Sequence, residues 1–187
     1  PVKALFIPYA GVTLSWDDNI DCVAVTDHNS GEWIDPLKAA YAEMKQANAA
    51  SNTLSGFREI HIFPGVEISV HGGFHLLAIF DPDATSQTVS DLLAQVGYNG
   101  TRGDSDSVTR DGGATVIDKI RTAGGLAILA HVDGDKGLLQ LKEATRQCQL
   151  DPNTVRQVLL TQGLLALEWR DQVAQTPALL DDLKLSF

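Results

Sequence analysis

Short apolar runs alternate with segments of helical spacing along most of this chain, and no other feature limits its fold as strongly. Asp21–Thr26 reads DCVAVT, a nearly continuous apolar run rich in β-branched residues, which suits a strand buried on both faces. Trp33–Ala47 then places its apolar residues at helical spacing. Strands that alternate with helices indicate an α/β domain whose sheet is largely parallel and either open or closed into a barrel.

The same patterns predict the remaining elements. Further strands are predicted at Glu59–Phe63, Val66–Val70, Phe74–Phe80, Leu126–Ala130 and Leu164–Trp169. Further helices are predicted at Gln87–Val96, at Thr115–Ala123 and, each opened by a capping residue and a proline, near 152–162 and 177–184. Breaks are expected at Pro64-Gly65 and Gly72-Gly73, and loops at Asn48–Gly56 and Gly97–Gly113. The longer loop is too polar and glycine-rich for a core element, and loops of that length are usually functional or mobile.

The length and charge of the chain limit its class. Its 187 residues, 44% hydrophobic and 20% charged, are ordinary for one soluble globular domain, so we expect a single domain over residues 1–187. A net charge of −10 argues against a surface that binds phosphate backbones through clustered Lys and Arg. Nucleic acid stays open as a substrate, because a site with divalent cations supplies its own positive charge.

The two cysteines and the lack of long apolar runs indicate the cellular compartment of the protein. Cys22 and Cys148 lie far apart without a metal-ligand spacing, so we expect both to be reduced and buried. No apolar run approaches the ~18 residues that cross a bilayer, and the first residues do not resemble an export signal. We therefore expect a cytoplasmic protein without a membrane partner.

Three histidines and one glutamate stand in or beside the strand-like runs: His28, His75, His131 and Glu67. Imidazole and carboxylate are ligands that Zn, Mn and Fe prefer, and residues at strand ends can converge although they are distant in sequence. Any one histidine after a strand is more often a hydrogen-bonded structural residue. The shared placement of all four predicts part of a site for two or three metal ions.

Four motifs carry a resemblance to a known family. TDH at 26–28, PGVE at 64–67, HLLAIF at 75–80 and LAHVDG at 129–134 resemble, in this order, successive motifs of the PHP (polymerase and histidinol phosphatase) superfamily. The resemblance spans about residues 21–170. It implies a distorted (β/α)7 barrel with a metal cluster at the C-terminal ends of its strands.

The resemblance also implies roles for single residues. Carried over position by position, it makes His28, Glu67, His75 and His131 metal ligands, and it makes Asp27 a weak ligand or a residue behind the ligands. Asp27 and His131 are then the candidate catalytic residues. The implied activity is that of a phosphoesterase in which Mn, Zn or Fe ions activate water and clamp the phosphoryl oxygens.

Two departures from the superfamily pattern stand out. The pattern begins with an HxH pair, yet residues 1–20 contain no histidine, and its final Asp-x-His motif is also missing. Either the site has decayed or these residues belong to a longer polypeptide. We expect the second, with the barrel incomplete at both ends, because a decayed site would not be expected to keep all four internal motifs. The fragment by itself is then expected to be nearly inert.

Within the superfamily, TDHNSGEW, PGVEISV and HLLAIFD look most like PHP domains fused to an ABC/SMC-like ATPase in bacterial antiviral defence proteins. No P-loop motif occurs in this sequence, so such an ATPase would lie on another segment or subunit. This sub-resemblance favours a phosphodiesterase or nuclease acting on DNA or RNA. A small-molecule phosphatase and an inactive module partnered with an ATPase are the alternatives.

Cationic side chains outside the motifs are candidates for substrate binding. Arg102 and Arg110 in the polar loop, and Lys119 after it, could hold a substrate phosphate or could be solvated surface charges. His61 is expected opposite the core face of its strand, and His71 is expected in solvent at a hairpin tip, with a position facing the site as the alternative. The residues expected in the core are Trp33, Tyr41 and Trp169.

Overall fold

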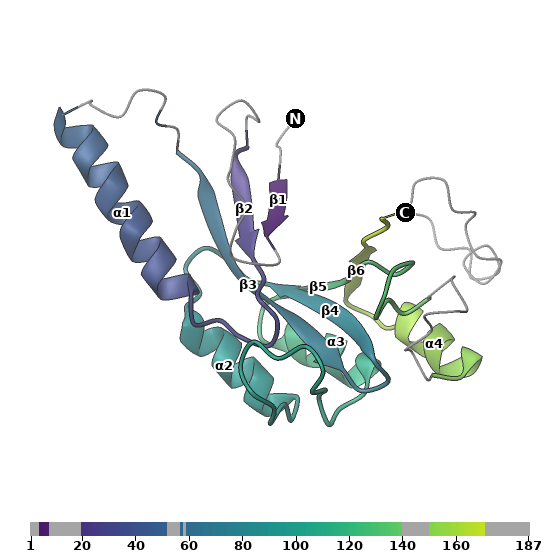
Figure 1. The fold of residues 1–187 in the computed structure, drawn as a ribbon. Coiled ribbons are helices and arrows are strands. Elements are labelled where there is room, and N and C mark those ends of the chain that lie inside the picture. Colours follow the sequence, from purple (N-terminus) through teal and green to yellow (C-terminus); the bar gives the residue numbers. More distant parts are fainter. Residues whose placement is uncertain (1–3, 8–19, 52–56, 58, 140–149, 171–187) are drawn as a thin grey trace.

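The computed structural model describes residues 4–7, 20–51, 57, 59–139 and 150–170, which form one mixed sheet with helices beside it (Figure 1). Its six strands lie in chain order: β1 (Ala4–Ile7), β2 (Cys22–Val25), β3 (His61–Val70), β4 (Phe74–Ile79), β5 (Leu126–Leu129) and β6 (Leu164–Leu167). The helices are α1 (Ile34–Ser51), α2 (Ser86–Gln95), α3 (Gly113–Thr122) and α4 (Pro152–Leu159). The α/β class predicted from the sequence is confirmed.

The sheet is less parallel than the sequence predicted. β1–β2, β2–β3 and β5–β6 pair in parallel, but β4 runs antiparallel to both β3 and β5. The reason is the tight turn between β3 and β4, where Gly72 and Gly73 have positive φ angles of 104° and 83°. So short a connection can only join antiparallel strands. Over the described residues the sheet is open, with β1 and β6 at its edges, and the seven-stranded barrel is not seen.

The expected break at Pro64-Gly65 is wrong, because β3 runs through it. The strand changes partner there: its first half pairs with β2, and from Gly65 onward it pairs with β4. Proline is tolerated at such a position, and its carbonyl accepts a hydrogen bond from Phe80 N at 2.8 Å. A Cβ on Gly65 would lie 2.8 Å from the Ala78 carbonyl oxygen, so close packing requires glycine.

The predicted helices agree with the structure to within a few residues. α1 continues to Ser51, into the segment expected as a loop. Asp151 caps α4 by accepting hydrogen bonds from the backbone of Asn153 and Thr154. The helix predicted near 177–184 and Cys148 lie outside the described residues, and Cys22 is a free thiol that is only partly buried.

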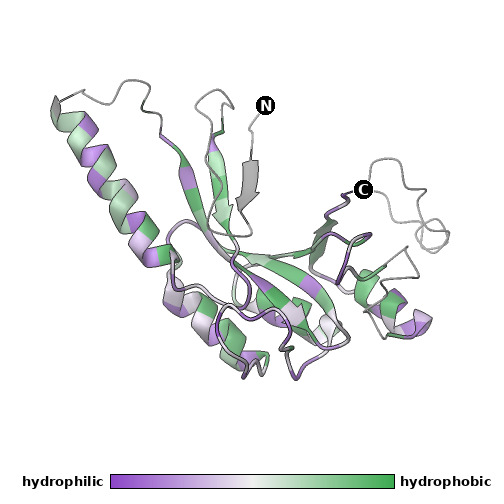
Figure 2. Ribbon diagram, viewed as in Figure 1, coloured by the Kyte–Doolittle hydropathy of each residue, from purple (hydrophilic) through white to green (hydrophobic). Residues whose placement is uncertain are grey.

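The core lies between the sheet and helices α2, α3 and α4. Figure 2 shows hydrophobic residues along the strands and a mixture of polar and apolar residues on α1. Trp33, expected in the core, is 63% exposed, because only Ile34 at the start of α1 turns inward. Tyr41 is partly buried and accepts a hydrogen bond from Ile60 N, and Trp169 packs partly buried against the core. No helix in the described part of the chain is both long and apolar enough to cross a membrane.

Candidate metal centre

The sheet topology brings the four expected ligands to one rim. β2 and β3 are parallel neighbours, and β3 and β5 run in the same direction on either side of antiparallel β4. His28 and His131 therefore follow β2 and β5 at the same end of the sheet, and His75 opens β4 at that end. An isolated bridge joins His28 to Glu67 of β3. The strands β2 and β5, which His28 and His131 follow, thus run in the same direction as β3, which carries Glu67.

One carboxylate oxygen of Glu67 is the centre of this cluster. Glu67 Oε1 lies 2.7 Å from His75 Nδ1, 3.0 Å from His131 Nε2 and 3.6 Å from His28 Nε2. The His28 and His131 rings each stand edge-on to the His75 ring, with centroids 5.1 and 5.2 Å apart. His28 and His131 thus lie close together, as the sequence predicted.

The backbone around the cluster is unusual at three positions. Asn29, directly after His28, His131 and Lys136 have positive φ angles of 46°, 30° and 55°, which non-glycine residues adopt at some energetic cost. Backbone hydrogen bonds from Glu67 N to Asp27 O and from Asn29 N to Glu67 O attach the segment around His28 to β3. The backbone N–H of His131 donates a hydrogen bond to Glu168 Oε2 at 2.9 Å, which stabilises the turn after β5.

The histidines keep Glu67 ionised in spite of its burial. Burial raises the pKa of a carboxyl group, but hydrogen bonds from His131 and His75 and the charges of His28 and His75 outweigh it and lower the pKa of Glu67 to about 2. Burial lowers the pKa of His75. Burial opposes protonation of His131 as well, but the Glu67 hydrogen bond and the Glu67 and Glu168 charges raise its pKa above 6.5.

The residues of the cluster fit a divalent cation. Donor atoms of His28, Glu67 and His75 all lie within 4.8 Å of one another, and His131 joins them through the shared Glu67 oxygen. Imidazole nitrogen and carboxylate oxygen are the donors that Zn, Mn and Fe accept. A cation bound among the three imidazoles would also neutralise the charge of the buried Glu67 carboxylate.

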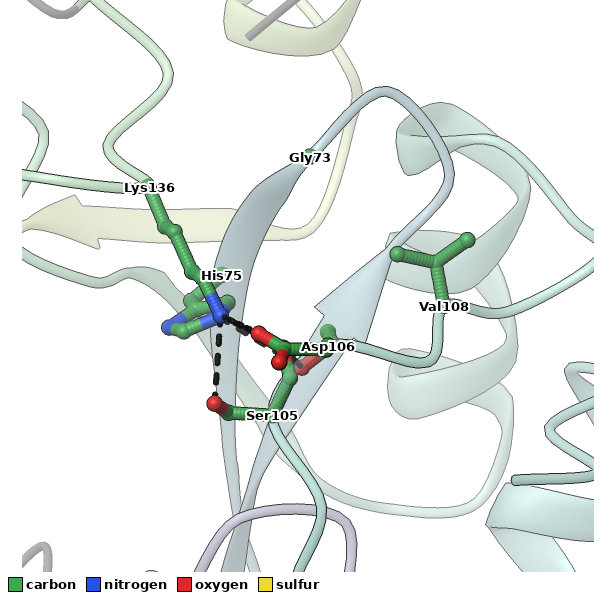
Figure 3. Close-up of a pocket in the computed structure, with 7 residues that line it drawn as sticks. Gly73, His75, Ser105, Asp106, Val108 and Lys136 are labelled. Carbon is green, nitrogen blue, oxygen red and sulfur yellow. Dashed lines mark hydrogen bonds and ion pairs between the residues drawn. The ribbon is translucent and has the colours of Figure 1, made fainter. Parts of the chain in front are cut away.

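A cavity of about 500 Å³ opens over the cluster. It is lined by the following residues: Thr26, His28, Glu67, His75, Leu77, Ser105, His131, Asp135, Lys136, Glu168 and Arg170. A second hollow of about 160 Å³ shares His75, Ser105 and Lys136 with it (Figure 3). There the Lys136 ammonium contacts Ser105 and Asp106. Ser105 therefore brings the Gly97–Gly113 loop to the rim where the His28, Glu67, His75 and His131 side chains lie.

Arg102 and Arg110, considered for phosphate binding, lie outside the cavity, and Asp27 lies directly beside the cluster. Arg102 and Arg110 are exposed and do not line either hollow, and Arg110 faces Asp111 at 3.5 Å. Asp27 meets Glu67 through its backbone, and its carboxyl does not line the cavity. Burial raises the pKa of Asp27, with the charge of His28 acting in the opposite direction.

Other residues lie where the sequence expected them, away from the cluster. His61 and His71 are exposed, and neither lines the cavity. Lys119 lies in α3, after the polar loop, and donates hydrogen bonds to Gln95 O and to the Asp111 carboxylate, so it is a structural charge that does not line the cavity.

The sequence reasoning missed two cations at the cavity, Lys136 and Arg170. Arg170 comes shortly after β6, so the rule that placed His28 and His131 at strand ends would also have singled it out. Lys136 has no such signal. It enters through the turn after His131, where its carbonyl accepts a hydrogen bond from His75 N at 3.0 Å.

Comparisons with known proteins add a distant likeness. No protein-family model matches the chain, and no curated protein matches it. Among solved structures, one match is an amidohydrolase from Chromobacterium violaceum, determined with bound sulfate and no metal. The two are 15% identical with a TM-score of 0.40, and the match covers 79% of this chain but 66% of that one, just under two thirds.

Proposed function

We propose that this protein is a divalent-metal-dependent hydrolase. The observation that supports it is the approach of three imidazole nitrogens, at 2.7, 3.0 and 3.6 Å, to one buried Glu67 oxygen at a cavity. A cation held by these residues would lower the pKa of a bound water and polarise the bond under attack.

Within this class we propose a phosphoester substrate. The order of the four motifs, with their resemblance to the PHP superfamily, is the first support. The second is that Lys136 and Arg170 line the cavity and can bind anionic oxygens. A phosphodiester, as in DNA or RNA, is our first choice because of the likeness to defence proteins, and an ATPase segment or subunit is the partner that this likeness suggests.

A catalytically inactive module is the second candidate. It is favoured by the lack of any histidine in residues 1–20, where the superfamily pattern has an HxH pair. Four ligands can hold one cation, whereas a mechanism with two metals needs more. This candidate predicts metal binding without hydrolysis.

Metal content and hydrolysis, measured together, test the proposal. Purified protein should bind Mn²⁺ or Zn²⁺, and His28→Ala/His131→Ala should lose most of that metal together with any hydrolysis of bis(p-nitrophenyl) phosphate. The control is His61→Ala/His71→Ala, which removes the same number of imidazoles from exposed positions outside the cavity. Equal metal content in the two double variants would refute the site. Metal binding without hydrolysis, in the polypeptide that carries the remaining motifs, would favour the inactive module.

A further inference from the structure

We propose that Asp106 occupies the place of an anionic substrate oxygen on the Lys136 ammonium, and that it leaves when such an oxygen enters the metal cavity. The inference rests on the proposed function, because it takes the phosphoester substrate as given, and it names a residue that limits the affinity for that substrate. It is carried by the contacts of Lys136 and by the exposure of Asp106 (Figure 3).

Lys136 lies at both hollows beside the metal ligands. Its side chain is 23% exposed and lines the cavity of about 500 Å³ as well as the hollow of about 160 Å³. Its backbone carbonyl accepts a hydrogen bond from His75 N at 3.0 Å, which attaches the residue directly to the strand β4. The ammonium is thus a point charge beside the expected ligands, where it can bind an anionic group of a substrate.

All three hydrogens of this ammonium are in use. Lys136 Nζ lies 2.8 Å from Ser105 O, 3.1 Å from Ser105 Oγ and 2.8 Å from Asp106 Oδ1, and an ammonium group has three N–H donors. Figure 3 shows that Ser105 and Asp106 contact the nitrogen from the polar loop. A substrate oxygen can therefore accept a hydrogen bond from Lys136 only if one of these partners leaves.

Asp106 is the partner that can leave most easily. Its side chain is 88% exposed, so water can solvate the carboxylate once it has left the ammonium, and an exposed ion pair contributes little to stability. The Ser105 carbonyl is held in place, because it also accepts a hydrogen bond from the hydroxyl of Ser69, which is 1% exposed. Ser105 therefore keeps the ammonium in position while its third partner is exchanged.

The charges at the cavity give this exchange an effect on affinity. Three carboxylates line the cavity together with two cationic side chains: Glu67, Asp135, Glu168, Lys136 and Arg170. Asp106 adds a further negative charge 2.8 Å from one of the two cations. Loss of the Asp106 charge should therefore make Lys136 bind an anionic oxygen more tightly.

The phosphate affinity of a variant without the Asp106 charge tests the exchange. Zn²⁺-loaded protein is titrated with inorganic phosphate at fixed ionic strength, and calorimetry gives the dissociation constant. Asp106→Asn should lower this constant about two- to fivefold, the range that corresponds to an exposed ion pair. The control is Asp118→Asn, which removes the same charge from an exposed ion pair with Arg121 outside the cavity and should keep the wild-type value. A dissociation constant in Asp106→Asn equal to or above that of the control would overturn the inference.

A second set of variants tests whether Asp106 acts through Lys136. Lys136→Met should raise the dissociation constant for phosphate about tenfold or more, because it removes a charge-assisted hydrogen bond. Asp106→Asn added to Lys136→Met should then give no further gain, since the cation that Asp106 neutralises is gone. An equal gain in the wild-type and Lys136→Met backgrounds would indicate a general effect of charge and would overturn the inference.

These outcomes are distinguishable from failure of the proposed hydrolase. Tighter phosphate binding in Asp106→Asn that depends on Lys136, without hydrolysis of bis(p-nitrophenyl) phosphate, would support the inference and overturn the hydrolase. Hydrolysis together with an unchanged phosphate affinity in Asp106→Asn would do the reverse. A lack of Zn²⁺ uptake would overturn the hydrolase, and the same titrations without added metal would still decide the exchange.

Discussion

At the scale of single residues, the two arginines that the sequence offered as phosphate candidates do not line the cavity, whereas Arg170 does. In a polypeptide that contains this domain and hydrolyses bis(p-nitrophenyl) phosphate, we expect Arg170→Ala to raise KM for that substrate about tenfold or more, because a charge-assisted hydrogen bond contributes ~1.5–3 kcal/mol. The effect on kcat should be smaller. Steady-state kinetics checks this, with Arg110→Ala as the matched control, since that side chain is exposed beside Asp111. Equal KM values in the two variants would contradict the assignment.

At the scale of elements, the turn after β5 positions His131, and the backbone of this turn packs most closely at Gly137. A Cβ at Gly137 would lie 2.2 Å from His131 O and 2.6 Å from the Val132 backbone, and these atoms cannot move without displacing the turn. We expect Gly137→Ala to cost ~1–3 kcal/mol of unfolding free energy, the range for overpacking, and to weaken metal binding. Gly134→Ala is the control in the same turn, because its nearest contact is 3.3 Å. Denaturant melts and metal titrations compare the two, and an unperturbed Gly137→Ala would refute the prediction.

At the scale of the whole molecule, Glu67 couples folding of the metal-free protein to pH. Its pKa falls from 4.5 to about 2 on folding, so its stabilising contribution is present above pH 4.5 and is lost as the pH falls towards 2. His131 acts oppositely: its raised pKa gives a contribution that is present below pH 6.5 and lost as the pH rises through the folded-state value. We expect the denaturation midpoint to fall in acid, and to fall less in Glu67→Gln. Parallel pH profiles for the two proteins would contradict this.

The sequence by itself determined most of the elements, although not β1 (Ala4–Ile7), and the residue types of the cluster. Strand and helix positions followed from periodicity, because the spacing of apolar residues along the chain shows which local face is buried. DCVAVT before His28 is an example. His28, His75 and His131 could be found because each borders a strand-like run. The metal-binding role of these residues stays a prediction.

Only the tertiary structure decided which strands pair and which polar groups meet. β3 continues through Pro64-Gly65 because its first half pairs with β2 and its second half with β4. A local sequence pattern cannot predict a pairing with a strand that is distant in sequence. For the same reason, Arg170 reaches the cavity while Arg102 does not. The ion pair of Lys136 with Asp106 joins two separate segments, so it exists only once the turn after β5 and the polar loop have packed together.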